Sequence, residues 1–285
     1  MPVCIKDPCG VLCILLTYVA VFYADYVIIQ WVVLQTMHNS LWGPFNVVLF
    51  NTIIFLLGMA HLKAVCSDPG IVPLPESRLD FSDIHTGSQV SLQHEDWTVC
   101  TRCETYRPPR AHHCRICNRC IRRMDHHCPW INNCVGEQNQ KYFIQFLIYV
   151  GVLSCYAILL VATSWLGECP SCSEEVMVKQ TRILHSVILV LESTLFGMFV
   201  GAILADQVQA ILTDETGVEQ VQAMRLKGLK AEPKRPNRPR YTLMAEVCGR
   251  SHPLLWLLPC IPPPSNNRHA SSMSPSGASL HQYEV

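Results

Sequence analysis

Residues 100–134 read CTRCETYRPPRAHHCRICNRCIRRMDHHCPWINNC. This stretch holds seven of the chain's 16 cysteines together with four histidines. Structural zinc binds four cysteine or histidine ligands in a tetrahedron, and Cys-x2-Cys is its usual half-site. Two zinc sites of three cysteines and one histidine each would use six of the seven cysteines, which leaves one cysteine over. The spacing therefore predicts a small unit with two metal sites and a surplus cysteine that is free for other chemistry.

The segments on both sides of this unit are apolar enough to cross a bilayer. Of the 285 residues, 49% are hydrophobic and only 15% are charged, and the net charge is zero. A bilayer core of ~30 Å calls for about 20 apolar residues per helix, and four stretches meet this requirement: 11–33, 45–65, 143–165 and 183–204. We therefore predict an all-α membrane protein with four transmembrane helices and a small, hairpin-rich zinc domain between the second and third.

The placement of lysine and arginine predicts the orientation of the helices. The loop at 68–141 carries nine of these residues and the region after Leu204 another nine, whereas the loop at 34–44 carries none. Because positively charged loops stay in the cytosol, we expect both termini and the cysteine-rich unit there. Cytosolic thiols are kept reduced, so they bind metal or react. On the lumenal side, Cys169 and Cys172 are either a disulfide pair or two free thiols.

Composition divides the chain into segments that we expect to have different roles. In order, they are the N-terminus with the first two helices (1–67), a linker (68–95), the cysteine-rich domain (96–140), the last two helices (141–212), a cytosolic C-terminal region (213–261) and a disordered tail (262–285). The cysteine-rich domain is too small to fold without metal. We also expect a short helix at 206–230 and an apolar segment at 251–260 that lies on the membrane or packs on the cytosolic domain.

The surplus cysteine has a strong candidate in Cys128. Spacing alone leaves open which histidines bind metal, how the two ligand sets interleave and which cysteine is spare. Cys128 directly follows Asp125, His126 and His127. A thiol reacts as its thiolate, which a neighbouring imidazole favours. A carboxylate that orients the imidazole completes an arrangement typical of nucleophilic catalysis.

At these residues the chain resembles the DHHC family of protein S-acyltransferases (palmitoyltransferases). The resemblance covers the four-helix layout, the cysteine-rich unit, its continuation at 129–136, and the Asp-Pro-Gly sequence at 68–70. It implies that Cys128 is the nucleophile, His126 its base and Asp125 the partner of His126. It also implies two structural zinc ions, one bound by Cys100, Cys103, His113 and Cys120 and the other by Cys114, Cys117, His127 and Cys134.

The resemblance further implies an enzyme that takes a long-chain acyl group from palmitoyl-CoA and passes it through Cys128 to cysteines of membrane-proximal proteins. Arg122, Arg123 and Lys141 are candidates for contacts with the CoA phosphates, and the alternative for each is a solvated or lipid-facing charge. The family has a threonine where this chain has Gly217, which predicts weaker support for Asp125. By family analogy we expect a Golgi location in the endomembrane system, and no nucleic-acid partner.

Other features and functions remain open at this point. Leu153 and Tyr156 are candidates for setting acyl-chain length. Asp25 and Glu192 are carboxylates inside predicted helices, where they line a polar part of the acyl cavity, pair with Tyr and His groups, or pack in the protonated form. The residues at 283–285 form a candidate PDZ ligand. The alternatives to a fully active enzyme are a membrane-anchored zinc scaffold and a weakly active family member, but a scaffold has no need of a surplus cysteine beside a histidine.

Overall fold

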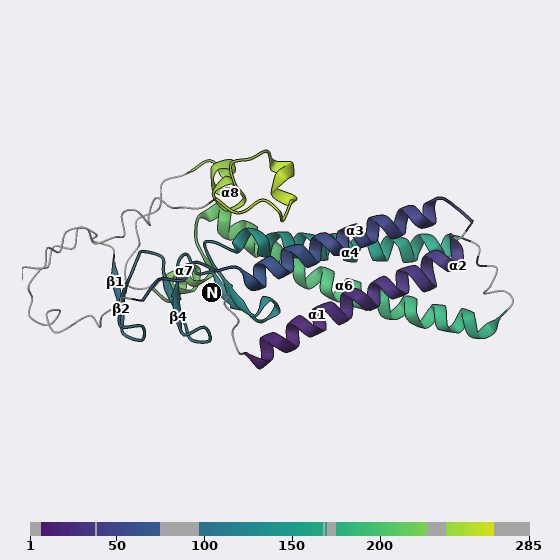
Figure 1. Cartoon of the computed structure of the whole chain (residues 1–285), viewed down its shortest axis with the longest axis horizontal. Coiled ribbons are helices and arrows are strands. Elements are labelled where there is room, and N and C mark those ends of the chain that lie inside the picture. Colours follow the sequence, from purple (N-terminus) through teal and green to yellow (C-terminus); the bar gives the residue numbers. More distant parts are fainter. Residues whose placement is uncertain are drawn as a thin grey trace, which may run out of the picture.

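The computed structural model describes most of the chain, namely residues 7–37, 39–74, 97–167, 169, 175–226 and 238–264. Figure 1 shows long helices side by side along the long axis, with the strands gathered at one end. The predictions for the linker at 75–95, for Cys172 and for the PDZ ligand at 283–285 concern segments outside the described residues.

Four helices are long and apolar enough to cross a membrane: Pro8–Thr36, Trp42–Cys66, Gln140–Leu166 and Val176–Thr213. The first consists of α1 (Pro8–Val27), the π-helical segment η1 (Ile28–Val33) and α2 (Leu34–Thr36), and the other three are α3, α4 and α6. Large apolar side chains such as Leu15, Phe55 and Leu195 are exposed on the outer faces, as lipid-facing helices require. The predicted four-helix membrane fold is confirmed.

The core of the bundle is centred on α4, which packs against both α3 and α6. Phe50, Phe143 and Leu189 are among the side chains buried there. The same buried cluster includes Cys128 and Ile131 from the cysteine-rich domain. The loop that carries the predicted nucleophile is therefore part of the membrane bundle's core and is not a separate surface unit.

Between α3 and α4 lie three antiparallel hairpins, as the sequence predicted. They are β1 (Thr98–Cys100) with β2 (Thr105–Arg107), β3 (His112–Cys114) with β4 (Arg119–Ile121), and β5 (His126–Cys128) with β6 (Asn133–Val135). The Cys-x2-Cys turns form the tips of the first two hairpins, where Glu104 and Asn118 have φ angles of 48° and 51°. The tip of the third contains the short helix η3 (Pro129–Ile131) and Asn132, at φ 45°.

The region after the fourth membrane helix differs from the single helix predicted at 206–230. α6 continues to Thr213, and the chain then turns at Asp214, which has a left-handed φ of 54°. A second helix, α7 (Gly217–Leu226), follows. Aspartate tolerates the left-handed conformation better than most residues because its short side chain bonds locally. The prediction was wrong because it missed this break.

The apolar segment predicted at 251–260 is hydrogen-bonded to α4, and its position on the membrane or on the cytosolic domain stays a prediction. It follows α8 (Arg240–Cys248) and contains the short helix η4 (Pro253–Leu257). Three polar side chains on one face of α4 bond to its carbonyl oxygens. Lys141 Nζ reaches Ile261 O at 3.1 Å, Gln145 Nε2 reaches Trp256 O at 2.6 Å, and the Tyr149 hydroxyl donates to Leu257 O.

Candidate active site and metal centres

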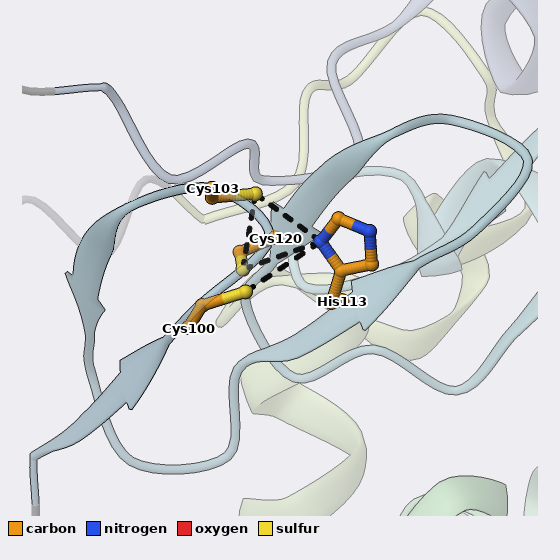
Figure 2. A group of neighbouring side chains, drawn as sticks. All are labelled: Cys100, Cys103, His113 and Cys120. Atoms are coloured by element: carbon orange, nitrogen blue, oxygen red, sulfur yellow. Dashed lines mark hydrogen bonds between the residues drawn. The ribbon is translucent and has the colours of Figure 1, made fainter.

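One candidate metal site joins the first two hairpins. The sulfur atoms of Cys100, Cys103 and Cys120 and the Nδ1 atom of His113 lie within 4.8 Å of one another (Figure 2). From His113 Nδ1 the sulfurs of Cys103, Cys100 and Cys120 are 3.1, 3.7 and 4.0 Å away. A tetrahedral zinc with bonds of about 2.0–2.3 Å places its ligands roughly 3.5–3.8 Å apart. The donor set therefore fits such an ion.

A second candidate site joins the middle hairpin to the third. Its donors are Cys114, Cys117, His127 and Cys134, which again lie within 4.8 Å of one another. The sulfur atoms are 3.4–3.7 Å from His127 Nδ1, and Cys117 Sγ is 3.3 Å from Cys134 Sγ. The structure thus brings together both sets of four residues that the family resemblance named, and neither set includes Cys128.

Cys128 lies beside a histidine that a carboxylate holds in place. Successive side chains alternate across a strand, so on β5 His126 and Cys128 share one face while His127 turns to the metal site. His126 Nδ1 is 2.6 Å from Asp125 Oδ2, and the ring also hydrogen-bonds with the Cys128 sulfur. Burial alone would lower the pKa of His126, but the hydrogen bonds with Asp125 and Cys128 raise it to about 9. His126 is therefore protonated at neutral pH.

Asp125 is held by the C-terminal end of α6 and by the start of α7. The backbone N–H of Gly217 donates to Asp125 Oδ1 at 2.6 Å, and Gln207 Nε2 donates to Oδ2 at 2.7 Å. Burial would raise the pKa of Asp125, but the hydrogen bonds from His126, Gly217 and Gln207 hold it below its usual value. Since Gly217 contributes a backbone group, glycine supplies this contact as well as threonine. No sequence pattern had singled out Gln207.

A network of ion pairs holds the cysteine-rich domain against the α6–α7 junction. Arg110 pairs with Asp214 at 2.9 Å and with Glu219 at 2.8 Å, and Arg123 pairs with Asp214 at 3.1 Å. Arg238 adds a further contact with Glu246 on α8. This network fixes the position of α7, and with it the Gly217 amide that binds Asp125.

The three predicted CoA contacts all have partners within the protein. Arg122 pairs with Glu137 at 3.2 Å, Arg123 pairs with Asp214, and the buried Lys141 bonds to a backbone carbonyl. These cations lie at the end of the bundle that carries the hairpins. A CoA phosphate would have to share or displace these partners, so their role in binding CoA stays a prediction.

Cys128 opens onto an apolar cavity inside the helical bundle. The cavity is lined by α1, α3, α4 and α6, with Thr17, Leu57, Phe143, Leu153 and Phe199 among the side chains in its wall. Trp130, two residues after Cys128, also lines it. The cavity thus connects the predicted nucleophile with the interior of the membrane helices.

Two of the four residues singled out inside the helices face this cavity. Leu153 and Glu192 line it. Tyr156 does not: its hydroxyl donates to Asn46 Oδ1 at 2.6 Å, so its predicted contact with the acyl chain is not supported. Asp25 also lies outside the lining and accepts a hydrogen bond from Asn51 at 3.0 Å.

The loop after Cys128 is anchored to α1 and α3 by residues that the sequence did not reveal. The buried His61 hydrogen-bonds with the Trp130 carbonyl and the Tyr18 hydroxyl, both at 3.0 Å. Asn133 Nδ2 donates to carbonyls at the end of α3, including Ser67 O at 3.0 Å. A Cβ atom on Gly10 would lie 2.3 Å from the Asn132 side chain. These contacts fix the position of the loop along the axis of the helical bundle.

Comparison with known proteins identifies the family. The family model described as DHHC palmitoyltransferase matches residues 93–224. The chain is 35% identical over 268 residues to palmitoyltransferase ZDHHC3 of Homo sapiens, covering 91% of this chain and 83% of that protein. It is 36% identical over 264 residues to palmitoyltransferase ZDHHC7 of Mus musculus, covering 90% and 80%. It is 32% identical over 186 residues to probable protein S-acyltransferase 16 of Arabidopsis thaliana, covering 64% and 63%. The chain belongs to the DHHC palmitoyltransferase family.

Proposed function

We propose that Cys128 carries the acyl group in this protein S-palmitoyltransferase and that palmitoyl-CoA is the donor. One observation supports this assignment above the others. The Cys128 sulfur contacts a histidine oriented by Asp125 and at the same time lies in the wall of an apolar cavity. A nucleophile for a lipid thioester needs both features, because it must be activated and must meet the end of a buried hydrocarbon chain.

The first half of the proposed reaction acylates the enzyme. Protonated His126 stabilises negative charge on the neighbouring sulfur. The sulfur of Cys128 attacks the thioester carbon, a new S–C bond forms, and the C–S bond to CoA breaks. His126 gives its proton to the departing CoA sulfur and becomes neutral, while Asp125 keeps the ring in place.

The second half passes the acyl group to a protein substrate. Neutral His126 takes the proton from the substrate cysteine, whose sulfur attacks the acyl carbon on Cys128. The Cys128 sulfur leaves as a thiolate beside the newly protonated His126, which restores the starting state. One thioester replaces another in each half, so no further energy source is needed.

The cavity supports a long acyl chain as the transferred group. Burying each CH2 group contributes roughly 0.8 kcal/mol, so a chain that fills the cavity binds more tightly than a short one. Phe143, Leu153 and Phe199 provide apolar walls for it. Arg122, Arg123 and Lys141 are the proposed contacts for the CoA phosphates at the mouth.

The two metal sites are proposed to hold structural zinc. A bound zinc ion would supply folding free energy to a domain with little core of its own. In this assignment the cytosol holds both termini, the zinc domain and the protein substrates, and the membrane is that of the Golgi. The domain boundaries predicted from composition, and a PDZ partner for the C-terminus, are further proposals.

Substitution of Cys128 tests the central assignment. We expect Cys128→Ala and Cys128→Ser to abolish hydroxylamine-sensitive labelling of the purified protein by palmitoyl-CoA, because the acceptor sulfur is gone. Zinc content should stay at two ions per chain. A variant that lost zinc would show Cys128 to be a ligand, and one that still acylated would show the nucleophile to be elsewhere.

The role of His126 is tested separately. His126→Ala should keep both zinc ions and acylate at least about 100-fold more slowly, within the range typical of an acid–base group. A time course of labelling with palmitoyl-CoA measures the rate. An undiminished rate would remove His126 from the mechanism while leaving Cys128 as the nucleophile.

A further inference from the structure

The cavity that begins at Cys128 runs a long way into the bundle. On α4 its lining residues extend from Phe143 to Ala157, and on α6 from Ile203 to Glu192. At ~1.5 Å per helical residue these distances are about 21 and about 16 Å. Phe143 contacts His126 with ring centroids 5.5 Å apart, which places this end of α4 beside the active site. Ala157 and Glu192 therefore belong to the opposite, deep end.

The deep end of the cavity carries a carboxyl group, whereas the rest of its lining is mainly apolar, with Thr17 and Ser154 as further hydroxyl side chains. The innermost lining residues are Ala24 on α1, Ala157 on α4, and Glu192 and Ser193 on α6. Two of these side chains are single methyl groups, so Glu192 is the large one. Its carboxyl group and the Ser193 hydroxyl give the deep end hydrogen-bonding capacity that the walls near Phe143 and Phe199 lack.

Glu192 differs from the other intramembrane carboxylate in lacking a hydrogen-bond partner. Asp25 accepts a hydrogen bond from Asn51 at 3.0 Å. Among the residues that the structure describes, no hydrogen bond reaches the Glu192 carboxyl group. Tyr23 lies near Glu192, but its hydroxyl is hydrogen-bonded to His185 Nδ1 at 2.9 Å. Carboxyl groups inside membranes are costly unless they are paired.

The occupant of the cavity can supply the missing partner. We propose that Glu192 and Ser193 form a polar subsite that accepts a hydroxyl group at the ω end of the acyl chain, so that the enzyme transfers ω-hydroxyacyl groups as well as saturated ones. This proposal rests on the proposed function, because it requires the chain attached to Cys128 to fill this cavity. A saturated chain ends in a methyl group and leaves Glu192 without a partner.

The chemistry at Cys128 is the same for both kinds of chain. The sulfur of Cys128 forms a bond to the thioester carbon, the bond to the CoA sulfur breaks, and the distant hydroxyl takes no part. A hydroxyl group donates to a carboxylate and accepts from a carboxylic acid, so Glu192 has a partner in either protonation state. The subsite therefore changes the choice of substrate without changing the reaction.

The test compares palmitoyl-CoA with ω-hydroxypalmitoyl-CoA as acyl donors to the full-length protein. We expect the wild type to be acylated by both, with kcat/KM values within about tenfold of each other. Glu192→Leu should lower the ratio of kcat/KM for ω-hydroxypalmitoyl-CoA to kcat/KM for palmitoyl-CoA by about 10- to 100-fold, as expected for loss of a hydrogen bond to a charged group. Glu192→Gln should keep most of the ratio, and Asp25→Asn, the matched control, should leave it unchanged.

A second comparison needs no variant and so does not depend on the folding of one. In the wild type, a palmitoyl-CoA whose hydroxyl lies nearer the thioester, beside Leu147 and Val150, should react at least about tenfold more slowly than the ω-hydroxy isomer, because that hydroxyl would meet apolar walls. Equal rates for the two isomers would overturn the proposal. It would also be overturned if Glu192→Leu left the donor ratio unchanged and only admitted longer saturated chains, since Glu192 would then be a steric stop.

Failure of the proposed function would look different from failure of this inference. A wild-type protein that is acylated by palmitoyl-CoA but rejects ω-hydroxypalmitoyl-CoA keeps Cys128 as the acyl carrier and contradicts only the polar subsite. A wild-type protein that palmitoyl-CoA does not acylate contradicts the proposed function itself.

Discussion

The two metal sites have the same donor chemistry but hold different parts of the molecule. The first, Cys100, Cys103, His113 and Cys120, ties the outer hairpin β1–β2 to β3–β4. The second takes two of its ligands, His127 and Cys134, from the hairpin that carries Cys128. His127 directly precedes Cys128 and pairs with Cys134 across the hairpin. Two metal sites with the same kinds of ligand can therefore differ in how directly they position the nucleophile. The site whose ligands are nearer to Cys128 in the sequence has the more direct effect.

Removal of a ligand from the second site should have the largest effect. Cys134→Ala removes one of the two metal ligands on the β5–β6 hairpin. We expect the variant to lose one zinc ion. We also expect its acylation rate to fall by about 1000-fold or more, because metal binding provides the folding energy of this hairpin. Metal analysis and palmitoyl-CoA labelling measure the two effects. Normal acylation by a protein with only one zinc ion would refute the distinction between the sites.

The equivalent change in the first site should be milder. Cys100→Ala should also cost one zinc ion, but it leaves the ligands on the Cys128 hairpin in place, so we expect acylation to fall by roughly tenfold. The same two measurements apply, with Cys134→Ala as the matched comparison. Equal losses in the two variants would mean that the domain folds as one cooperative unit around both ions.

The pH profile sharpens the comparison further. The pKa of His126 is raised to about 9, chiefly by Asp125 once the opposing effect of burial is overcome, so the ring is charged below that pH and loses its proton as pH rises through it. Asp125→Asn should move this loss of activity to lower pH, toward the ordinary value of His126, and reduce the rate several-fold near pH 8.

Acylation rates between about pH 6 and pH 10 would show the shift. Cys100→Ala should keep the wild-type shape of the profile at a lower rate, because the first metal site does not contact His126. Superimposable profiles for Asp125→Asn and the wild type would mean that Asp125 does not control the proton on His126.

A change outside both metal sites should have the smallest effect. A Cβ atom on Gly217 would lie 3.3 Å from Asp125 Oδ1, so the carboxylate has to move by only a few tenths of an ångström while the Gly217 N–H still donates to it. We expect Gly217→Ala to alter the acylation rate by about twofold to threefold. If Gly217→Ala lowered the acylation rate as much as Cys100→Ala, the placement of α7 against Asp125 would matter as much for activity as the first metal site.

Much of this architecture could be predicted because its signals are local in the sequence. The ligand spacing around the Cys-x2-Cys turns and the length of the apolar runs each depend on neighbouring residues. The support given to Asp125 by Gln207, and to the active-site loop by His61, joins helices that are distant in the chain. Polar residues at these positions carry no pattern that reveals their partners.

The prediction for Tyr156, which the cavity lining does not support, has a related physical cause. A soluble helix reveals its buried face by amphipathic periodicity, but a membrane helix that is apolar all round does not. The side of α4 that faces the cavity was therefore ambiguous, and Tyr156 instead bonds to Asn46 on α3. The α6–α7 break was missed for a different reason, because a left-handed aspartate leaves little trace in the sequence.

The hydrogen bonds between α4 and the C-terminal segment determine where the protein can be shortened. Lys141 is 1% exposed, and its ammonium group bonds to the carbonyl oxygen of Ile261. A buried ammonium group that loses its acceptor is strongly destabilising. Truncations that remove Ile261 would therefore damage the active-site end of α4 even though they delete no catalytic residue. Tags and reporters belong at the far C-terminus, and shortened variants should retain the chain through Ile261.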